Sequence, residues 1–202
     1  RRLYPTNHSI KRRRTRSLNM AISIENNAKK QLLWIGMGSI LMFFAGLTSA
    51  YIVRKPEGDW LDFMLPEYFT ISTIIILLSS IVLFFVKGNL RKEKSIFNIA
   101  TGALVLGVLF TFFQVKGWQE LIAQGVYLTG EGSNASGSFL YVLTLAHLAH
   151  LLGGLIALAY VSFKSKQNTY TIKNSLAIDL TSVYWHFLTI LWLFLFFLIN
   201  FY

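Results

Sequence analysis

Five uncharged apolar runs limit the folds open to this chain more than any other feature. Each is 19 to 25 residues long, and they cover residues 32–53, 68–86, 96–115, 139–163 and 180–202. An α-helix rises about 1.5 Å per residue, so about 20 residues cross the hydrocarbon core of a bilayer. Hydrophobic residues make up 54% of the 202 positions, which is more than in an average soluble domain. The sequence therefore predicts an all-α polytopic membrane protein, a bundle of five transmembrane helices.

The distribution of basic residues predicts how this bundle is oriented. Nine of the 19 Lys and Arg residues lie in residues 1–30, four in 87–94 and three in 164–173, so 16 are expected on one side of the membrane. Basic residues accumulate on the cytoplasmic side of membrane proteins. We therefore expect the N-terminus inside, in the cytoplasm or a mitochondrial matrix, and the C-terminus outside. The formal net charge of +10 is explained by this topology, so no nucleic-acid partner is predicted.

The chain divides in sequence into a tail and a membrane domain. Residues 1–31 are basic and polar with little apolar periodicity, and predict an N-terminal tail, partly disordered, on the cytoplasmic side. Residues 32–202 form the predicted five-helix domain. Met20 opens the run that leads into the first helix, so residues 1–19 could be an upstream stretch or part of the native chain. An Arg-rich start also fits an organellar transit peptide, a less favoured alternative to a cytoplasmic tail.

The last predicted helix has two different faces. On a helical wheel its polar and aromatic residues fall on one arc, which we expect to contact other helices or a partner subunit because unpaired polar groups are costly in lipid. That arc contains Ser182, Trp185, His186, Thr189, Trp192, Phe196 and Asn200. A second arc contains Leu188, Leu191, Leu195 and Leu198, and predicts a lipid-facing surface.

Histidines within the predicted spans are the sharpest candidates for chemistry. His147 and His150 share a helix face with Thr144, and His186 begins the last helix. Three intramembrane histidines are too few for two bis-histidine hemes, although one heme between His150 and His186 is possible by count. The predicted helix directions place these two residues about half a hydrocarbon core apart in depth, which disfavours a shared heme.

Other chemistry finds little support in the sequence. None of the five runs contains an Asp, Glu, Lys or Arg, although ion pumps and proton carriers need such groups within the membrane. Cysteine is absent, which excludes thiolate metal sites and disulfides, and no catalytic motif is visible. We predict no catalytic residue, metal ligand or cofactor in this chain. A single-heme membrane cytochrome and a small transporter remain as alternative functions.

Four motifs in order resemble subunit III of the heme-copper oxidases, the cytochrome c oxidase and quinol oxidase family. They are TSAYIVR at 48–54, FFQVKGW at 112–118, LTLAHLAHLLGGL at 143–155, and YWHF at 184–187 with LWLFLF at 191–196. The resemblance covers most of residues 32–201 and matches the short, five-helix form. One departure is Gly117, which stands where the family pattern has Glu, so no proton-antenna role is expected of this position. The first helix also lacks the buried Glu that many members carry.

The resemblance implies a noncatalytic subunit of a proton-pumping respiratory terminal oxidase that reduces oxygen to water. It implies packing against subunit I, association with subunit II, hemes and copper in those partners, bound phospholipid, and support of stability and proton uptake. It also implies a bacterial inner membrane, with the mitochondrial inner membrane less favoured, and a possible supercomplex with a quinol-oxidising complex. The electron donor, cytochrome c or quinol, stays open. Candidate contacts with a partner or lipid are Arg54, Gln114, Thr144, His147, His150, Trp185, His186 and Trp192.

Overall fold

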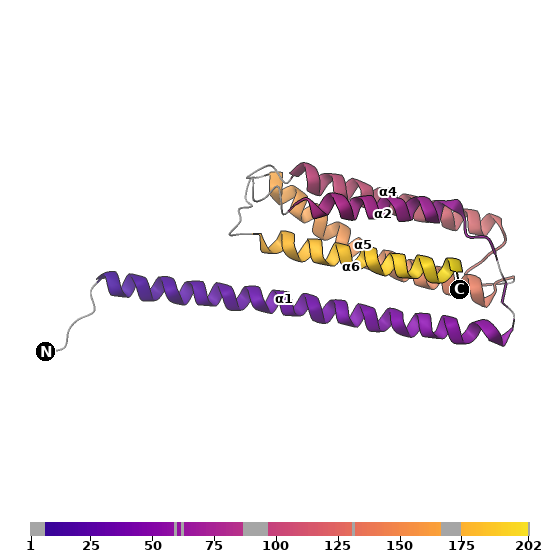
Figure 1. The fold of residues 1–202 in the computed structure, drawn as a ribbon, viewed down its shortest axis with the longest axis horizontal. Helices are drawn as coiled ribbons and strands as arrows, with labels where there is room; N and C mark the ends of the chain where they lie inside the picture. Colours follow the sequence, from indigo (N-terminus) through magenta and orange to yellow (C-terminus); the bar gives the residue numbers. More distant parts are fainter. Residues whose placement is uncertain are drawn as a thin grey trace. The chain divides into compact units, whose positions relative to one another are not determined.

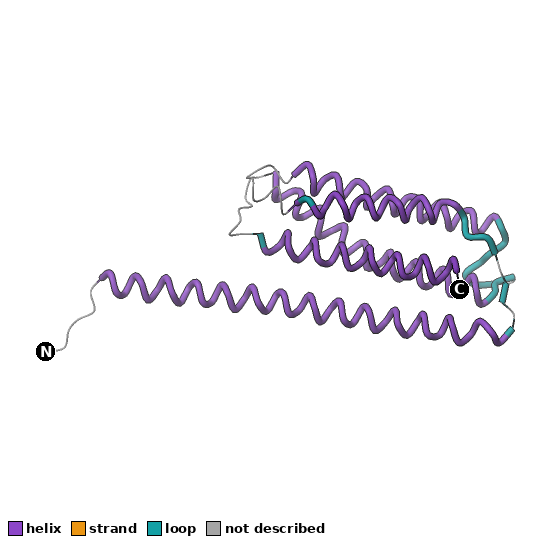
Figure 2. The backbone as a smooth tube through the Cα atoms, viewed as in Figure 1, coloured by secondary structure: helices purple, strands orange, loops and turns teal. Residues whose placement is uncertain are grey.

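The computed structural model describes residues 7–58, 60–61, 63–86, 97–130, 132–166 and 175–201. Within this part of the chain the structure is helical and has no strand (Figure 2). The helices are α1 (Asn7–Arg54), the short 3₁₀ helix η1 (Lys55–Glu57), α2 (Glu67–Phe84), α4 (Phe97–Ala123), α5 (Ala135–Lys166) and α6 (Leu176–Phe201), labelled in Figure 1. Five of them are long and apolar enough to cross a membrane. The predicted all-α fold with five membrane helices is thereby confirmed.

The first helix begins much earlier than its apolar run. α1 starts at Asn7, whereas the sequence analysis placed a tail over residues 1–31 and a helix start at residue 32. Lys and Arg are good helix formers, so a basic segment that continues into an apolar helix can remain helical outside the membrane. The chain forms two compact units, Arg1–Ser39 and Ile40–Tyr202, and each is described by itself.

The other helices also extend beyond the uncharged runs. α4 continues to Ala123, although its uncharged run ends before Lys116, so the connection to α5 is shorter than expected. α5 begins at Ala135, four residues before the predicted start, because the side chain of Asn134 caps it. The Asn134 Oδ1 atom accepts hydrogen bonds from the backbone N–H of Gly137 at 2.8 Å and from Ser136 Oγ at 2.6 Å. Helix limits are therefore set by caps as well as by charge.

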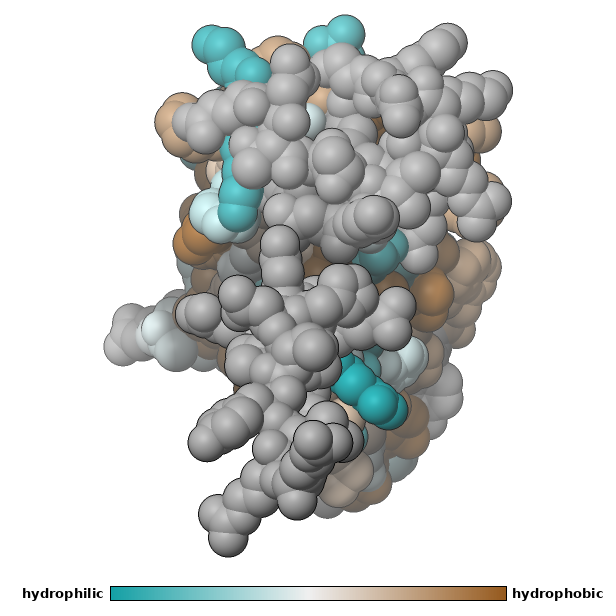
Figure 3. Space-filling model, turned by 90° about the vertical axis from the view of Figure 1, so that its left-hand side faces the viewer, coloured by the Kyte–Doolittle hydropathy of each residue, from teal (hydrophilic) through white to brown (hydrophobic). Residues whose placement is uncertain are grey.

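The second unit is a bundle in which neighbouring helices pack closely. α2 contacts α4 and α6, α4 contacts α5, and α5 contacts α6. Two glycines allow the closest approaches. A Cβ added at Gly107 would lie 2.6 Å from Trp185 Cη2, and one at Gly117 would lie 2.6 Å from Phe69 Cε2. Small residues at helix crossings let backbones approach, as helix association in lipid requires. Hydrophobic side chains line the visible flanks in Figure 3, which suits a surface in contact with acyl chains.

The predicted lipid-facing leucine surface of α6 is wrong. Leu188, Leu191 and Leu195 are 0%, 4% and 0% exposed. Leu191 and Leu195 belong to a cluster with Phe44 and Leu143, so the leucine face packs against other helices of its own unit. A helical wheel separates two faces but does not show how many neighbours a helix has. The exposed large side chains of α6 are instead Ile190, Phe194, Phe197 and Phe201.

Candidate functional site in the helix interior

Three tryptophans donate their indole N–H groups to hydroxyls on neighbouring helices. The Nε1 atom of Trp185 lies 3.1 Å from Ser79 Oγ, and that of Trp192 lies 2.9 Å from Thr73 Oγ1. The third bond joins Trp118 Nε1 to Thr144 Oγ1 at 3.1 Å. We call these three pairs the indole seam. It links α2 to α6 twice and α4 to α5 once.

The polar side chains of α2 support this seam. Ser79 Oγ donates to the Ala103 carbonyl at 2.9 Å while it accepts from Trp185, so this hydroxyl bridges α4 and α6. Towards the N-terminal end of α2, a second bond joins α2 to α4, because Gln114 Nε2 donates to Ser72 Oγ at 2.8 Å. Polar groups in a bilayer core need partners inside the protein. The hydroxyls of α2 therefore hold two neighbouring helices at fixed depth.

Replacing Thr73 with valine should destabilise the bundle by about 1 kcal/mol, because the buried indole N–H of Trp192 loses its acceptor while the side-chain shape is kept. The measurement is the thermal midpoint of the full chain purified with its partner subunits. Thr70→Val is the matched control, since Thr70 lies on the exposed side of the same helix. Equal thermal midpoints for the two variants would show that the Trp192–Thr73 hydrogen bond does not contribute to stability.

His147 lies at the centre of an aromatic cage. Its side chain is 0% exposed, with ring centroids 5.1 Å from Trp192 and 6.1 Å from Phe110. No described residue forms a hydrogen bond with either ring nitrogen. Trp192 in turn stacks on Phe69 at 6.4 Å. The cage joins α2, α4, α5 and α6 around one imidazole.

The other two membrane histidines point in different directions. His150 Nδ1 donates to the Ala146 carbonyl at 2.7 Å, and its ring lies 5.7 Å from that of Phe44 on α1. His186 Nδ1 is hydrogen-bonded to Ser80 Oγ of α2 at 2.5 Å. The two imidazoles therefore face different helices, which does not match a pair of axial heme ligands.

The expected depth offset between these histidines is wrong. Gly154 lies against Trp185, and His147 lies against Trp192, which fixes the antiparallel register of α5 and α6. In that register His150 and His186 differ in depth by about one helical turn rather than half a hydrocarbon core. The sequence estimate failed because it counted from predicted helix ends. A shared heme is disfavoured by the directions of the two rings, which face different helices.

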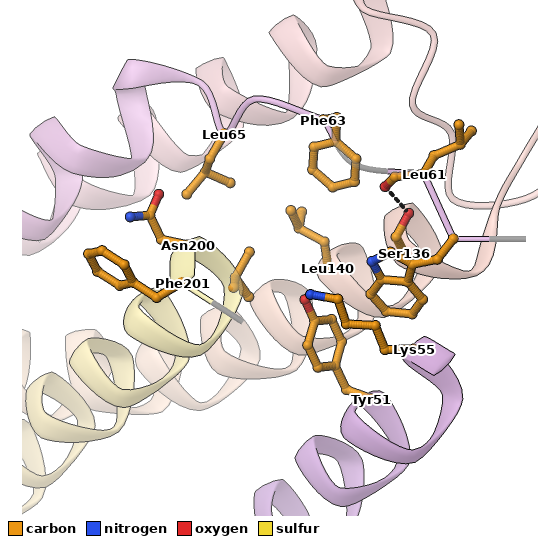
Figure 4. Close-up of a pocket in the computed structure, with 11 residues that line it drawn as sticks. Tyr51, Lys55, Leu61, Phe63, Leu65, Ser136, Leu140, Asn200 and Phe201 are labelled. Carbon is orange, nitrogen blue, oxygen red and sulfur yellow. Dashed lines mark hydrogen bonds between the residues drawn. The ribbon is translucent and has the colours of Figure 1, made fainter. Parts of the chain in front are cut away.

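An apolar groove and a smaller pocket lie along α1 and α6 within the second unit. The groove, about 520 Å³, runs between the C-terminal part of α1 and the middle of α6, where Leu41, Ala45, Ser49, Ile190 and Phe194 line it among others. The pocket, about 180 Å³, lies past the groove towards the ends of both helices. Figure 4 shows Tyr51 of α1 and Lys55 of η1 on one side of this pocket and Asn200 of α6 on another, with Ser136 bonded to the Leu61 carbonyl at 2.8 Å.

The structure separates the eight candidate residues into two groups. Five are at most 2% exposed and are enclosed by helices of this chain, namely Gln114, Thr144, His147, Trp185 and Trp192. Arg54, His150 and His186 are partly exposed, and Arg54 Nη1 also donates to the Gly58 carbonyl at 3.3 Å. The sequence reasoning missed the partners on α2, although hydroxyls at positions 72, 73, 79 and 80 repeat at a spacing that keeps them on one side of a helix.

The site as a whole joins helices. Among the described residues no group of three His, Cys, Asp or Glu side chains could hold a metal ion. The seam and the cage contain neutral donors, hydroxyls and aromatic rings, which position helices by hydrogen bonding and packing. Fold and site together define an integral membrane protein, a five-helix bundle whose interior tryptophans are hydrogen-bonded to neighbouring helices.

Comparison with known proteins identifies the family. The family model described as cytochrome c oxidase subunit III matches residues 63–202. A probable cytochrome c oxidase subunit 3 of Nocardia farcinica is 30% identical over 178 residues, covering 82% of each chain. Cytochrome c oxidase subunit 3 of Corynebacterium diphtheriae is 28% identical over 80% of this chain and 82% of its own length. A cytochrome bo(3) ubiquinol oxidase subunit 3 of Buchnera aphidicola is 29% identical over 80% of both chains.

The chain belongs to the cytochrome c oxidase subunit III family. It is a subunit III of a terminal oxidase, as the sequence motifs predicted, and it associates with other oxidase subunits.

Proposed function

We propose that this chain is a noncatalytic scaffold that packs beside subunit I of a proton-pumping oxidase. The observation that carries the proposal is the indole seam, in which the indole donors of Trp118, Trp185 and Trp192 are all used to join helices. An interior committed to such bonds supports a structural role. Oxygen reduction, with its hemes and copper, then belongs to the partner subunits I and II.

The topology proposed from the sequence completes this picture. The N-terminus lies in the cytoplasm and the C-terminus outside, because the basic residues gather in segments that share one side. Bacterial relatives favour the bacterial inner membrane. Of the candidate contacts, we propose Arg54, His150 and His186 as residues that meet a partner subunit or a lipid, because their side chains are partly exposed.

The apolar groove between α1 and α6 fits a phospholipid acyl chain. Its volume of about 520 Å³ is lined by aliphatic and aromatic side chains, with the hydroxyls of Thr48 and Ser49 as minor polar groups. Arg54 and Lys55 follow at the C-terminal end of α1, where cations can attract a phosphate group. Lipid held there would help to keep the subunit stable in the complex.

Filling the groove should release this lipid. Ser49→Phe places a large ring among the groove residues, and we expect the purified oxidase to lose a tightly retained phospholipid, measured by native mass spectrometry. Ile156→Phe is the control, because Ile156 is 72% exposed on α5 and does not line the groove. Unchanged lipid retention in Ser49→Phe would contradict the proposed lipid position.

Affinity purification tests the scaffold role itself. An oxidase purified through a tag on this chain in mild detergent should contain subunits I and II, heme and copper, and should consume oxygen. Recovery of the tagged chain without these partners would overturn the proposal.

A further inference from the structure

Two unpaired polar groups lie at the same depth inside the bundle. The Oε1 atom of Gln114 and both ring nitrogens of His147 are buried and form no hydrogen bond with any described residue. Gln114 is 2% exposed and His147 is 0% exposed. Buried polar atoms without a partner are rare in folded proteins, because each costs free energy. These three atoms therefore call for a specific explanation.

The register of α4 and α5 brings these groups together. Trp118 on α4 bonds to Thr144 on α5 at 3.1 Å, and farther along the same pair of helices Gly107 lies against Leu155. Both contacts fit one antiparallel register. Gln114 lies one turn before Trp118, and His147 lies one turn after Thr144. The amide and the imidazole are thus on facing helices at one level.

The neighbouring polar groups are already in use. Gln114 Nε2 donates to Ser72 Oγ at 2.8 Å, and the indole of Trp192 beside His147 donates to Thr73 at 2.9 Å. The remaining neighbours of the imidazole include the aromatic ring of Phe110. A partner subunit cannot supply the missing bonds, because helices of this chain already enclose both side chains. Only a small molecule can reach them.

We propose that Gln114 and His147 bind an internal water molecule between α4 and α5. Neutral imidazole carries one N–H donor and one acceptor nitrogen, and an amide oxygen accepts. Water that accepts from the imidazole N–H and donates to Gln114 Oε1 pairs two of the three atoms and joins α4 to α5. Buried waters of this kind bridge polar groups that the chain leaves unpaired. This site is independent of the proposed scaffold role.

Solid-state NMR of the histidine-labelled full chain, kept with its copurifying subunits in lipid, tests the site. Magnetisation should pass from water to the His147 ring N–H, although that side chain has no access to bulk water. His150 gives the reference signal of a ring N–H that is bonded within the protein, because its Nδ1–H donates to the Ala146 carbonyl. In Gln114→Met the water transfer to His147 should be lost, whereas Gln124→Met, at an exposed position of the loop after α4, should leave it unchanged.

A density map of the wild-type complex gives a second readout that needs no variant. We expect a separate peak between Gln114 Oε1 and the His147 ring. A direct hydrogen bond from the imidazole to Gln114 with no intervening density would overturn the proposal. Absence of water transfer to His147 in the wild-type protein would do so as well.

Discussion

Replacing Trp185 with alanine should destabilise the bundle by about 3 kcal/mol, the low end of the range for removing a buried large aromatic ring. The side chain is 0% exposed and lies against Gly107 and Gly154. The substitution also removes the donor to Ser79, the hydroxyl that bridges α4 and α6. Loss of packing contacts lowers stability in a bilayer, because helix association there depends on close contact more than on the hydrophobic effect.

The measurement is the amount of this subunit that stays with the purified oxidase, together with the thermal midpoint of the complex. Trp185→Ala should lower both while the heme spectrum of the partner subunits is unchanged. Trp34→Ala is the matched control, because Trp34 is 65% exposed within this chain. Full retention of Trp185→Ala in the complex would argue against a structural role for the indole seam.

Enlarging Gly107 should separate α4 from its neighbours. A Cβ at this position would lie 2.6 Å from Trp185 Cη2 and 2.8 Å from Leu155 Cδ2, which is closer than real Cβ contacts allow. We expect Gly107→Val to cost about 3 kcal/mol, at the upper end for overpacking, because a rigid ring and a second helix must both move. Assembly with the partner subunits should fall accordingly.

Gly102 offers a control in the same helix. The nearest atom to a Cβ at Gly102 is Val82 Cγ1 at 3.9 Å, an ordinary contact. Gly102→Ala should therefore be neutral or stabilise by up to about 1 kcal/mol through helix propensity. The check compares Gly107→Ala, Gly107→Val and Gly102→Ala in thermal midpoint and in subunit retention. A Gly107 series that behaves like Gly102→Ala would refute the close approach at this crossing.

The number and type of helices could be predicted because the bilayer imposes a simple length rule. Uncharged runs of about 20 residues have few alternatives to membrane helices, and all five are confirmed. Helix ends were harder to predict, because local bonds decide them. α4 runs past Lys116, and the Asn134 side chain starts α5 before its apolar run. Charged residues can extend a helix into the interface without breaking it.

The site was predictable only in part. The polar arc of α6 correctly indicated that Trp185 and Trp192 face protein, since unpaired indole donors are costly in lipid. The leucine arc led to the wrong prediction of a lipid-facing surface, because α6 is covered on more than one side and Leu191 packs against other helices. Pairings such as Trp192 with Thr73 depend on the register between helices distant in sequence. No pattern within a single helix contains that register.

The position of Gly117 gives the departure from the family pattern a physical explanation. The pattern that FFQVKGW resembles implies Glu at this point, while here a Cβ would meet the ring of Phe69 at 2.6 Å. Phe69 stacks on Trp192, so the aromatic interior occupies the space that a longer side chain would need. A carboxylate at this position would require the ring of Phe69 to move.

The scaffold role is tested most directly by removing this subunit from the purified oxidase and recording absorption spectra of both fractions. The separated chain should be colourless, and the remaining complex should keep its full heme absorption and its capacity to reduce oxygen. A heme band that travels with this chain, with a matching loss from the rest of the complex, would contradict the scaffold role.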